Sequence, residues 1–97
     1  MLLGLDLGTT NVKAVLAEAD GRVISRASVP VRMLHVGADG LEQDIGEIRS
    51  AALQALREAT GRTDASAVAA VGVSSQGGAL QMMDAEGRPL GRVISWM

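Results

Sequence analysis

The sequence of 97 residues has no cysteine, no phenylalanine and no tyrosine, and it has a single tryptophan, Trp96. The absence of cysteine excludes a disulfide framework, a thiolate metal site and cysteine catalysis. Because aromatic residues make up only 1% and hydrophobic residues 47%, a core must be built from Leu, Val, Ile, Met and Ala. The length allows one domain at most.

The sequence also lacks an excess of charge of one sign and a long apolar run. Its net charge of −2 excludes a nucleic-acid partner held by a basic face, and its hydrophobicity argues against intrinsic disorder. No uncharged run approaches the ~20 apolar residues of a spanning helix, so we expect no membrane partner. The first residues carry no basic region typical of a signal peptide, which predicts a cytoplasmic protein.

The hydrophobic pattern predicts a mixed α/β sheet. Apolar runs separated by turn residues predict strands at residues 2–7, 12–17 and 22–31, the first buried on both faces. Residues 34–43 are expected to be an exposed loop. Asp44 and Glu47 form a capping-box pattern that opens an amphipathic helix, which Gly61 ends.

After the helix, an apolar run predicts a second buried strand at residues 67–74, followed by short strands at 79–83 and 91–96. A strand that follows a crossover helix can lie parallel to an earlier strand. The expected fold is therefore three antiparallel strands, a crossover helix, a parallel strand and a short hairpin.

The last residues, 93–97, form an apolar run with no turn, cap or polar tail after it. A domain rarely stops inside a strand, so residues 1–97 are expected to be part of a longer protein. Such a fragment should expose apolar surface and tend to associate, which would allow a homo-oligomer.

The strongest signal for a binding site follows the first strand. Gly8 permits a sharp turn, and the N–H groups of Gly8, Thr9 and Thr10 can converge on an anion. Lys13, the only lysine, can reach phosphate oxygens, and Asp6 suits Mg²⁺ held through water. An ordinary hairpin with a polar turn is the alternative. A carboxylate in a strand buried on both faces favours the binding site, because an unpaired buried charge is costly.

Four segments in order resemble the FGGY family of carbohydrate kinases, and together they cover nearly the whole chain. The first, LGLDLGTTNVKAVL, resembles the first phosphate motif of the actin, hexokinase and heat-shock-chaperone superfamily. The others are DGLEQD, VGVSSQGGALQMMDAEGRPL and GRVISW. The resemblance implies the ribonuclease-H-like sheet of that superfamily.

The resemblance also implies roles for matching residues. Asp6 would lie near Mg²⁺. The implied ATP-phosphate-binding residues are Gly8, Thr9, Thr10 and Lys13. The implied substrate-binding residues are Glu42, Gln76, Gly77 and Trp96. As alternatives, Glu42 could be solvated, Gln76 could bond its own turn and Trp96 could be a core residue.

The implied activity is transfer of a phosphoryl group from Mg·ATP to a hydroxyl of a sugar or sugar alcohol. The catalytic base of such kinases is an Asp beyond residue 97, so the base is not identified and the isolated chain is expected to be inactive. Residues 1–97 would form part of the N-terminal domain. The alternatives are another ATPase of the superfamily, or a non-catalytic binding or oligomerising module. Nothing in the sequence chooses among sugars and polyols.

Overall fold

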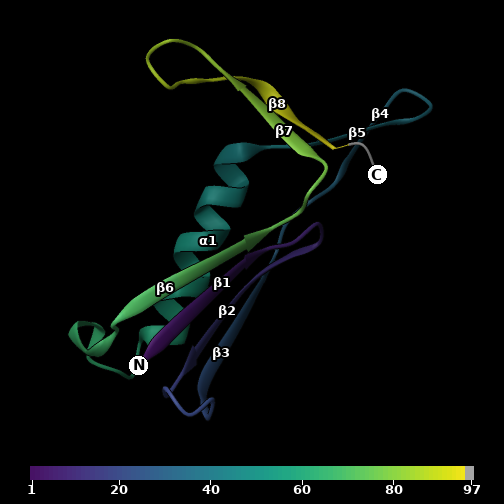
Figure 1. Cartoon of the computed structure of the whole chain (residues 1–97). Coiled ribbons are helices and arrows are strands. Elements are labelled where there is room, and N and C mark those ends of the chain that lie inside the picture. Colours follow the sequence, from purple (N-terminus) through teal and green to yellow (C-terminus); the bar gives the residue numbers. More distant parts are fainter. Residues whose placement is uncertain (96–97) are drawn as a thin grey trace.

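The computed structural model describes residues 1–95, in which one helix packs against a four-stranded sheet and a second four-stranded sheet lies at the N-terminal end of that helix (Figure 1). The larger sheet has the order β3-β2-β1-β6, with β1 at Leu2–Leu7, β2 at Asn11–Ala17, β3 at Val23–Pro30 and β6 at Ala70–Ser75. The smaller sheet has the order β4-β5-β8-β7, with β4 at Leu34–Val36, β5 at Gly40–Gln43, β7 at Ala79–Met83 and β8 at Pro89–Ser95. Helix α1 spans Ile45–Thr60, and a 3₁₀ turn, η1, spans Ala65–Ala67.

The larger sheet confirms the predicted topology. Strands β1 and β2 are antiparallel, with Leu5 opposite Ala14, and β2 and β3 are antiparallel as well. After the crossover through α1, β6 returns parallel to β1, with Leu5 beside Val73. The central position predicted for the first strand is therefore correct.

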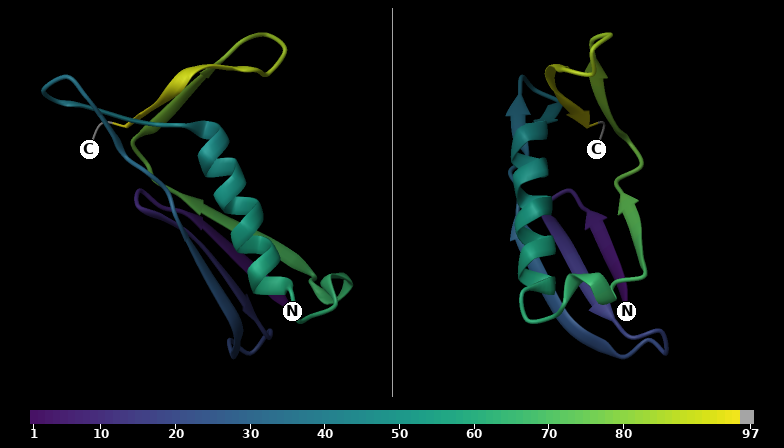
Figure 2. Two further views of the ribbon diagram at one scale, coloured as in Figure 1. Left: turned by 180° about the vertical axis from the view of Figure 1, so that it is seen from behind. Right: turned by 90° about the vertical axis from the view of Figure 1, so that its left-hand side faces the viewer.

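Helix α1 covers one face of the larger sheet, mainly over β2 and β3 (Figure 2). Its N-cap is Asp44, whose Oδ1 accepts hydrogen bonds from the N–H groups of Gly46 at 2.7 Å and Glu47 at 3.2 Å. The helix ends at the predicted place, since Gly61 is its C-cap. The core lies between helix and sheet, and its buried members include Leu3, Val12, Ala14, Leu16, Ala27, Val29, Ile48, Ala51, Ala55 and Ala59.

The second half of the predicted capping box is wrong. The Glu47 carboxylate does not return to the N-cap but accepts hydrogen bonds from the backbone N–H of Arg32 at 2.7 Å and from its guanidinium at 2.8 and 2.9 Å. Charge-assisted bonds of this kind are stronger than a bond to a neutral amide. These bonds lower the pKa of Glu47 and raise that of Arg32. The pair ties the segment after β3 to the start of α1.

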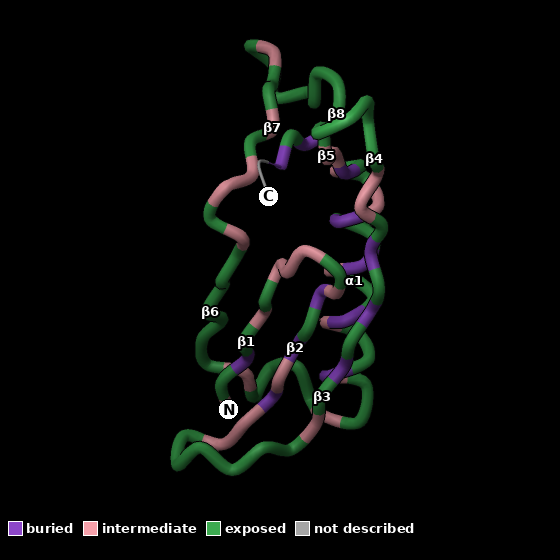
Figure 3. The backbone as a smooth tube through the Cα atoms, turned by 90° about the vertical axis from the view of Figure 1, so that its right-hand side faces the viewer, coloured by how far each residue is buried: buried purple, intermediate pink, exposed green. Residues whose placement is uncertain are grey.

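Two predictions of burial are also wrong. Strand β1 is covered on one face only, because Gly4 and Asp6 lie on the face opposite α1 and are exposed. Strand β6 was expected to be buried, yet each of its residues is exposed, with Val71 at 55% and Val73 at 65% (Figure 3). The reason is the position of α1, which packs over β2 and β3 and leaves the β6 edge uncovered. The predicted exposure of apolar surface is confirmed.

The expected loop at residues 34–43 is a β-hairpin instead. Strands β4 and β5 pair with Leu34 opposite Glu42, and Gly37 supplies the turn with a φ of +63°. Strand β5 then pairs with β8, with Gln43 opposite Val93, which joins this hairpin to the predicted β7–β8 hairpin. No helix among residues 1–95 has the length and apolar character needed to cross a membrane.

Candidate functional site

The candidate site lies where β1 and β6 end. These strands are parallel and in register, with Leu7 beside Ser75, so their carboxyl ends meet at one edge of the sheet. The backbone N–H of Gln76 donates to the carbonyl of Leu7 at 3.2 Å. The β1–β2 turn (residues 8–11) and the β6–β7 turn (residues 76–78) are thereby held next to each other. The first contains predicted phosphate-binding residues, and the second contains predicted substrate-binding residues.

The β1–β2 turn is closed by a hydrogen bond from the N–H of Gly8 to the carbonyl of Asn11, at 3.1 Å. This site needs glycine, because a Cβ on Gly8 would lie 2.7 Å from the Asn11 oxygen. The N–H of Gly8 is therefore used inside the turn and is not directed at a ligand. Within residues 1–95, the N–H groups of Thr9 and Thr10 have no hydrogen-bond partner, and Thr10 is exposed. These two groups are the available anion donors of the turn.

Asp6 and Lys13 lie side by side on the open face of the sheet. They are opposite each other in the β1–β2 register, and both are exposed. Because Asp6 is exposed, it does not bear the cost of a buried unpaired charge, and that cost gives no support to a binding role for Asp6. Within the described residues the two side chains form no ion pair, and together with Ser74 they line part of a shallow hollow. A carboxylate and an ammonium group are thus both accessible beside the β1–β2 turn.

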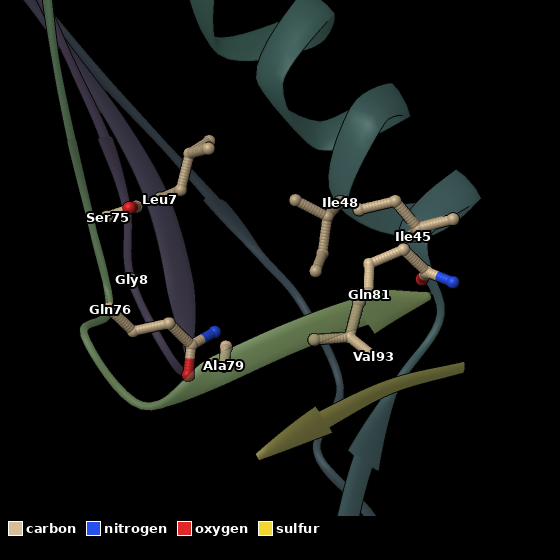
Figure 4. Close-up of a pocket in the computed structure, with 9 residues that line it drawn as sticks. All are labelled: Leu7, Gly8, Ile45, Ile48, Ser75, Gln76, Ala79, Gln81 and Val93. Carbon is tan, nitrogen blue, oxygen red and sulfur yellow. The ribbon is translucent and has the colours of Figure 1, made fainter. Parts of the chain in front are cut away.

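A pocket of about 170 Å³ lies on the other side of the strand ends, between them and the start of α1 (Figure 4). Its lining residues are Leu7, Gly8, Ile45, Ile48, Ser75, Gln76, Ala79, Gln81 and Val93. The wall is mostly apolar, and its polar side chains are the amides of Gln76 and Gln81 and the hydroxyl of Ser75. Apolar walls with a few placed polar groups are typical of small-molecule pockets.

Gln43 connects the two turns and was not selected from the sequence. Its side chain is 1% exposed. Its Nε2 donates to the carbonyl of Thr9 at 2.9 Å, and its Oε1 accepts from Nε2 of Gln76 at 2.6 Å. The signal that could have found it was the alternation of a strand at residues 40–43, which turns Gln43 to the face opposite Glu42. The loop prediction for this segment concealed that alternation.

The remaining predicted substrate residues are not all brought together. Glu42 is half-buried, and its Oε1 lies 3.6 Å from Nη1 of Arg92. It is not among the residues that line the pocket beside Gln76. Gly77 is exposed in the β6–β7 turn. Trp96 lies outside the described residues.

The described residues contain no cluster of carboxylate and imidazole metal ligands. Among residues 1–95, no three His, Asp or Glu side chains are close enough together to form a metal site. A single exposed carboxylate, Asp6, fits Mg²⁺ that keeps most of its ligands as water and phosphate oxygens. Asp6 is thus compatible with a magnesium ion that is brought to the site by phosphate oxygens.

The fold and the relatives agree on the class of protein. The xylulose kinase of Rhodospirillum rubrum superposes with a TM-score of 0.90 at 25% identity, over 96% of this chain and 20% of that one. This arrangement of sheet and helix is thus that of the N-terminal domain of actin-like kinases. In sequence, the chain is 35% identical to a glycerol kinase of Symbiobacterium thermophilum, over 98% of this chain and 20% of that protein. It is 30% identical to an apulose kinase of Pectobacterium atrosepticum, over 99% and 20% respectively.

The sequence profile of the FGGY family of carbohydrate kinases, N-terminal domain, matches residues 1–97. The chain belongs to this family. It spans about one fifth of the length of the relatives it matches.

Proposed function

We propose that this chain is part of the N-terminal domain of an ATP-dependent kinase that phosphorylates a hydroxyl of a sugar or sugar alcohol. The observation that carries the proposal is the juxtaposition of two turns at one sheet edge. One turn offers the N–H groups of Thr9 and Thr10, which no group of residues 1–95 binds, beside Asp6 and Lys13, and the other presents Gln76. A donor of phosphoryl groups and its acceptor must meet in this way.

In this proposal the β1–β2 turn binds the terminal phosphates of ATP. The N–H groups of Thr9 and Thr10 donate to phosphate oxygens, and Lys13 supplies a positive charge that can approach them. Asp6 accepts hydrogen bonds from water around the magnesium ion that accompanies ATP. When bound, Mg·ATP supplies the phosphoryl group and neutralises charge that develops on it. The tasks of the described residues are therefore positioning and charge stabilisation.

The sugar or polyol that accepts the phosphoryl group is assigned to the part of the site beside Gln76 and Gly77. The amide of Gln76 can accept a hydrogen bond from a sugar hydroxyl, and apolar neighbours suit the C–H faces of a sugar. Glu42 and Trp96 are kept as predicted acceptor ligands, and for Glu42 this role means sharing its carboxylate with Arg92. The relatives named above act on different acceptors, so the acceptor of this protein is not specified beyond a sugar or polyol.

Residues 1–97 should not carry out the reaction alone. A base that removes the hydroxyl proton contributes about 10²–10⁴ in rate in such reactions. The proposal places this base, an Asp, in a part of the protein beyond residue 97. It also assigns adenosine binding to another part of the protein.

The test uses the full-length protein encoded by the gene that carries this sequence. Release of ADP is measured with Mg·ATP and a panel of pentoses, hexoses and polyols, and phosphorylated product is identified by mass spectrometry. We expect at least one acceptor to raise ADP release well above the rate without acceptor. ADP release that no acceptor increases would contradict a carbohydrate kinase. The 97-residue chain serves as a second sample, and product formation by it would refute the proposed location of the base.

A further inference from the structure

The side chain of Gln43 is the polar group most completely enclosed in the described part of the chain. At 1% exposure it is as buried as the core residues Leu16 and Val12. A buried amide is retained only if its donors and acceptor find partners. Here both ends are paired, one with the β1–β2 turn and one with the β6–β7 turn.

The chemistry of the partners fixes the direction of these bonds. The carbonyl of Thr9 can only accept, so the Nε2 end of Gln43 must face it. The Oε1 end must then face Gln76, which has to donate through its own Nε2, as found at 2.6 Å. As a result, the chain of hydrogen bonds ends at the Oε1 of Gln76, which accepts no hydrogen bond from residues 1–95. Gln76 therefore presents an acceptor, which suits a hydroxyl donor of a ligand.

The same chain of bonds orients the other turn. In a trans peptide the C=O and the following N–H point in opposite directions, and no cis peptide is found among the described residues. Because Gln43 holds the carbonyl of Thr9, the N–H of Thr10 points away from Gln43. This is one of the two N–H groups that the proposed function assigns to phosphate.

We propose that Gln43 is a positioning residue that sets, through one amide, both the phosphate-binding N–H of Thr10 and the hydroxyl-accepting oxygen of Gln76. This inference rests on the proposed function and deepens it. It states that the nucleotide and acceptor subsites share a single buried support. A change at Gln43 should therefore alter the binding of both ligands, although it touches neither.

Three variants of the full-length protein distinguish the bond from Gln43 to Thr9 from the bond between Gln43 and Gln76. Gln43→Met removes both bonds and is expected to raise the KM for ATP and the KM for the acceptor by about tenfold each. Gln43→Glu keeps an oxygen toward Gln76 but places another against the carbonyl of Thr9. It should raise the KM for ATP by about tenfold and that for the acceptor by less than about threefold. Gln76→Met should raise mainly the KM for the acceptor.

The matched control is Gln54→Met, an exposed glutamine on α1 that bonds only to Glu58 at 2.9 Å. It should leave both KM values unchanged. A Gln43→Met protein that unfolds at a lower temperature but keeps both KM values would overturn the inference, since Gln43 would then be structural only. Equal changes of the two KM values in Gln43→Glu would overturn the assigned direction of the bonds.

The wild-type protein tests the proposed function separately from the inference about Gln43. If the wild-type protein phosphorylates no acceptor of the panel, the function is refuted, and with it the inference. If the wild type is active and the variants behave like the control, only the inference is refuted. Should the methionine variant not fold, the nearly isosteric glutamate variant decides.

Discussion

Replacing Gly8 with alanine is predicted to impair both the stability and the nucleotide binding of the full-length protein. The added Cβ would lie 2.7 Å from the carbonyl oxygen of Asn11, whereas ordinary contacts begin at 3.4 Å. The opposing atom belongs to the backbone of the turn, so no side-chain rotation can relieve the clash. The turn must open, and the 3.1 Å hydrogen bond between Gly8 and Asn11 is then weakened or lost.

The expected loss follows from these two effects. A lost hydrogen bond of this kind costs about 0.5–1.5 kcal/mol, and accommodation of an extra carbon in a tight site costs about 1–3 kcal/mol. Together they predict a destabilisation of about 1.5–4.5 kcal/mol. Opening the turn also displaces the N–H groups of Thr9 and Thr10, so the KM for ATP should rise by at least about tenfold.

The assay combines thermal unfolding with steady-state kinetics, and Gly72→Ala is the control. Gly72 lies in β6, and a Cβ there would meet nothing within 4 Å. Both substitutions reduce the entropy of the unfolded chain alike, which by itself stabilises by about 0.4–1 kcal/mol. If Gly8→Ala unfolds at the same temperature as Gly72→Ala and has the same KM for ATP, the reasoning about the turn is refuted.

Three further changes test other parts of the description. Lys13→Met should raise the KM for ATP by at least about tenfold and leave the unfolding temperature nearly unchanged, because Lys13 is exposed and forms no ion pair within residues 1–95. Glu47→Gln should lower the unfolding temperature at neutral pH. Arg32 lowers the pKa of Glu47 in the folded protein. The stabilisation by the Arg32–Glu47 pair is therefore complete above pH 4.5, the ordinary pKa of a glutamate, and it is lost as the pH falls through the lowered pKa of the folded protein. Val73→Thr should reduce self-association of the 97-residue chain in light scattering, because Val73 is 65% exposed there.

Each of these expectations has a contrary result. A Lys13→Met protein with an unchanged KM for ATP would remove Lys13 from the phosphate site. A difference between wild type and Glu47→Gln that persists at pH values well below 4.5 would show that the Arg32 bond is not its cause. Equal scattering from the 97-residue chain and its Val73→Thr variant would show that the β6 face does not drive association.

Local patterns were sufficient to predict the larger sheet. Its first three strands are consecutive along the chain, and the turns between them contain residues such as Gly21, which has a φ of +94°. The N-cap of α1 was also correctly predicted, because Asp44 bonds the first N–H groups of the helix directly. These features depend on residues that are near one another in sequence, and sequence patterns report such features well.

The smaller sheet could not be predicted in the same way. Strand β4 has three residues and β5 has four, too few for alternation to stand out. Strand β5 is also completed by β8, whose residues 93–95 are about fifty positions away along the chain. Pairing over such a separation leaves no local signal. The burial predicted for β6 was wrong for a related reason, since composition shows that a strand is apolar but not which element covers it.

The choice between Glu42 and Gln43 shows how the missing sheet affected the candidate site. Neighbouring residues of a strand face opposite sides, so only one of these two side chains can point toward the β1–β2 turn. In a loop that restriction does not hold, and Glu42 was predicted from the family resemblance alone. Pairing of β5 with β8 sets Gln43 inward and Glu42 toward Arg92. An uncharged amide is the better group for the inward position, because it can be buried with both ends paired, whereas a carboxylate there would oppose the carbonyl of Thr9 and bear the cost of an enclosed charge.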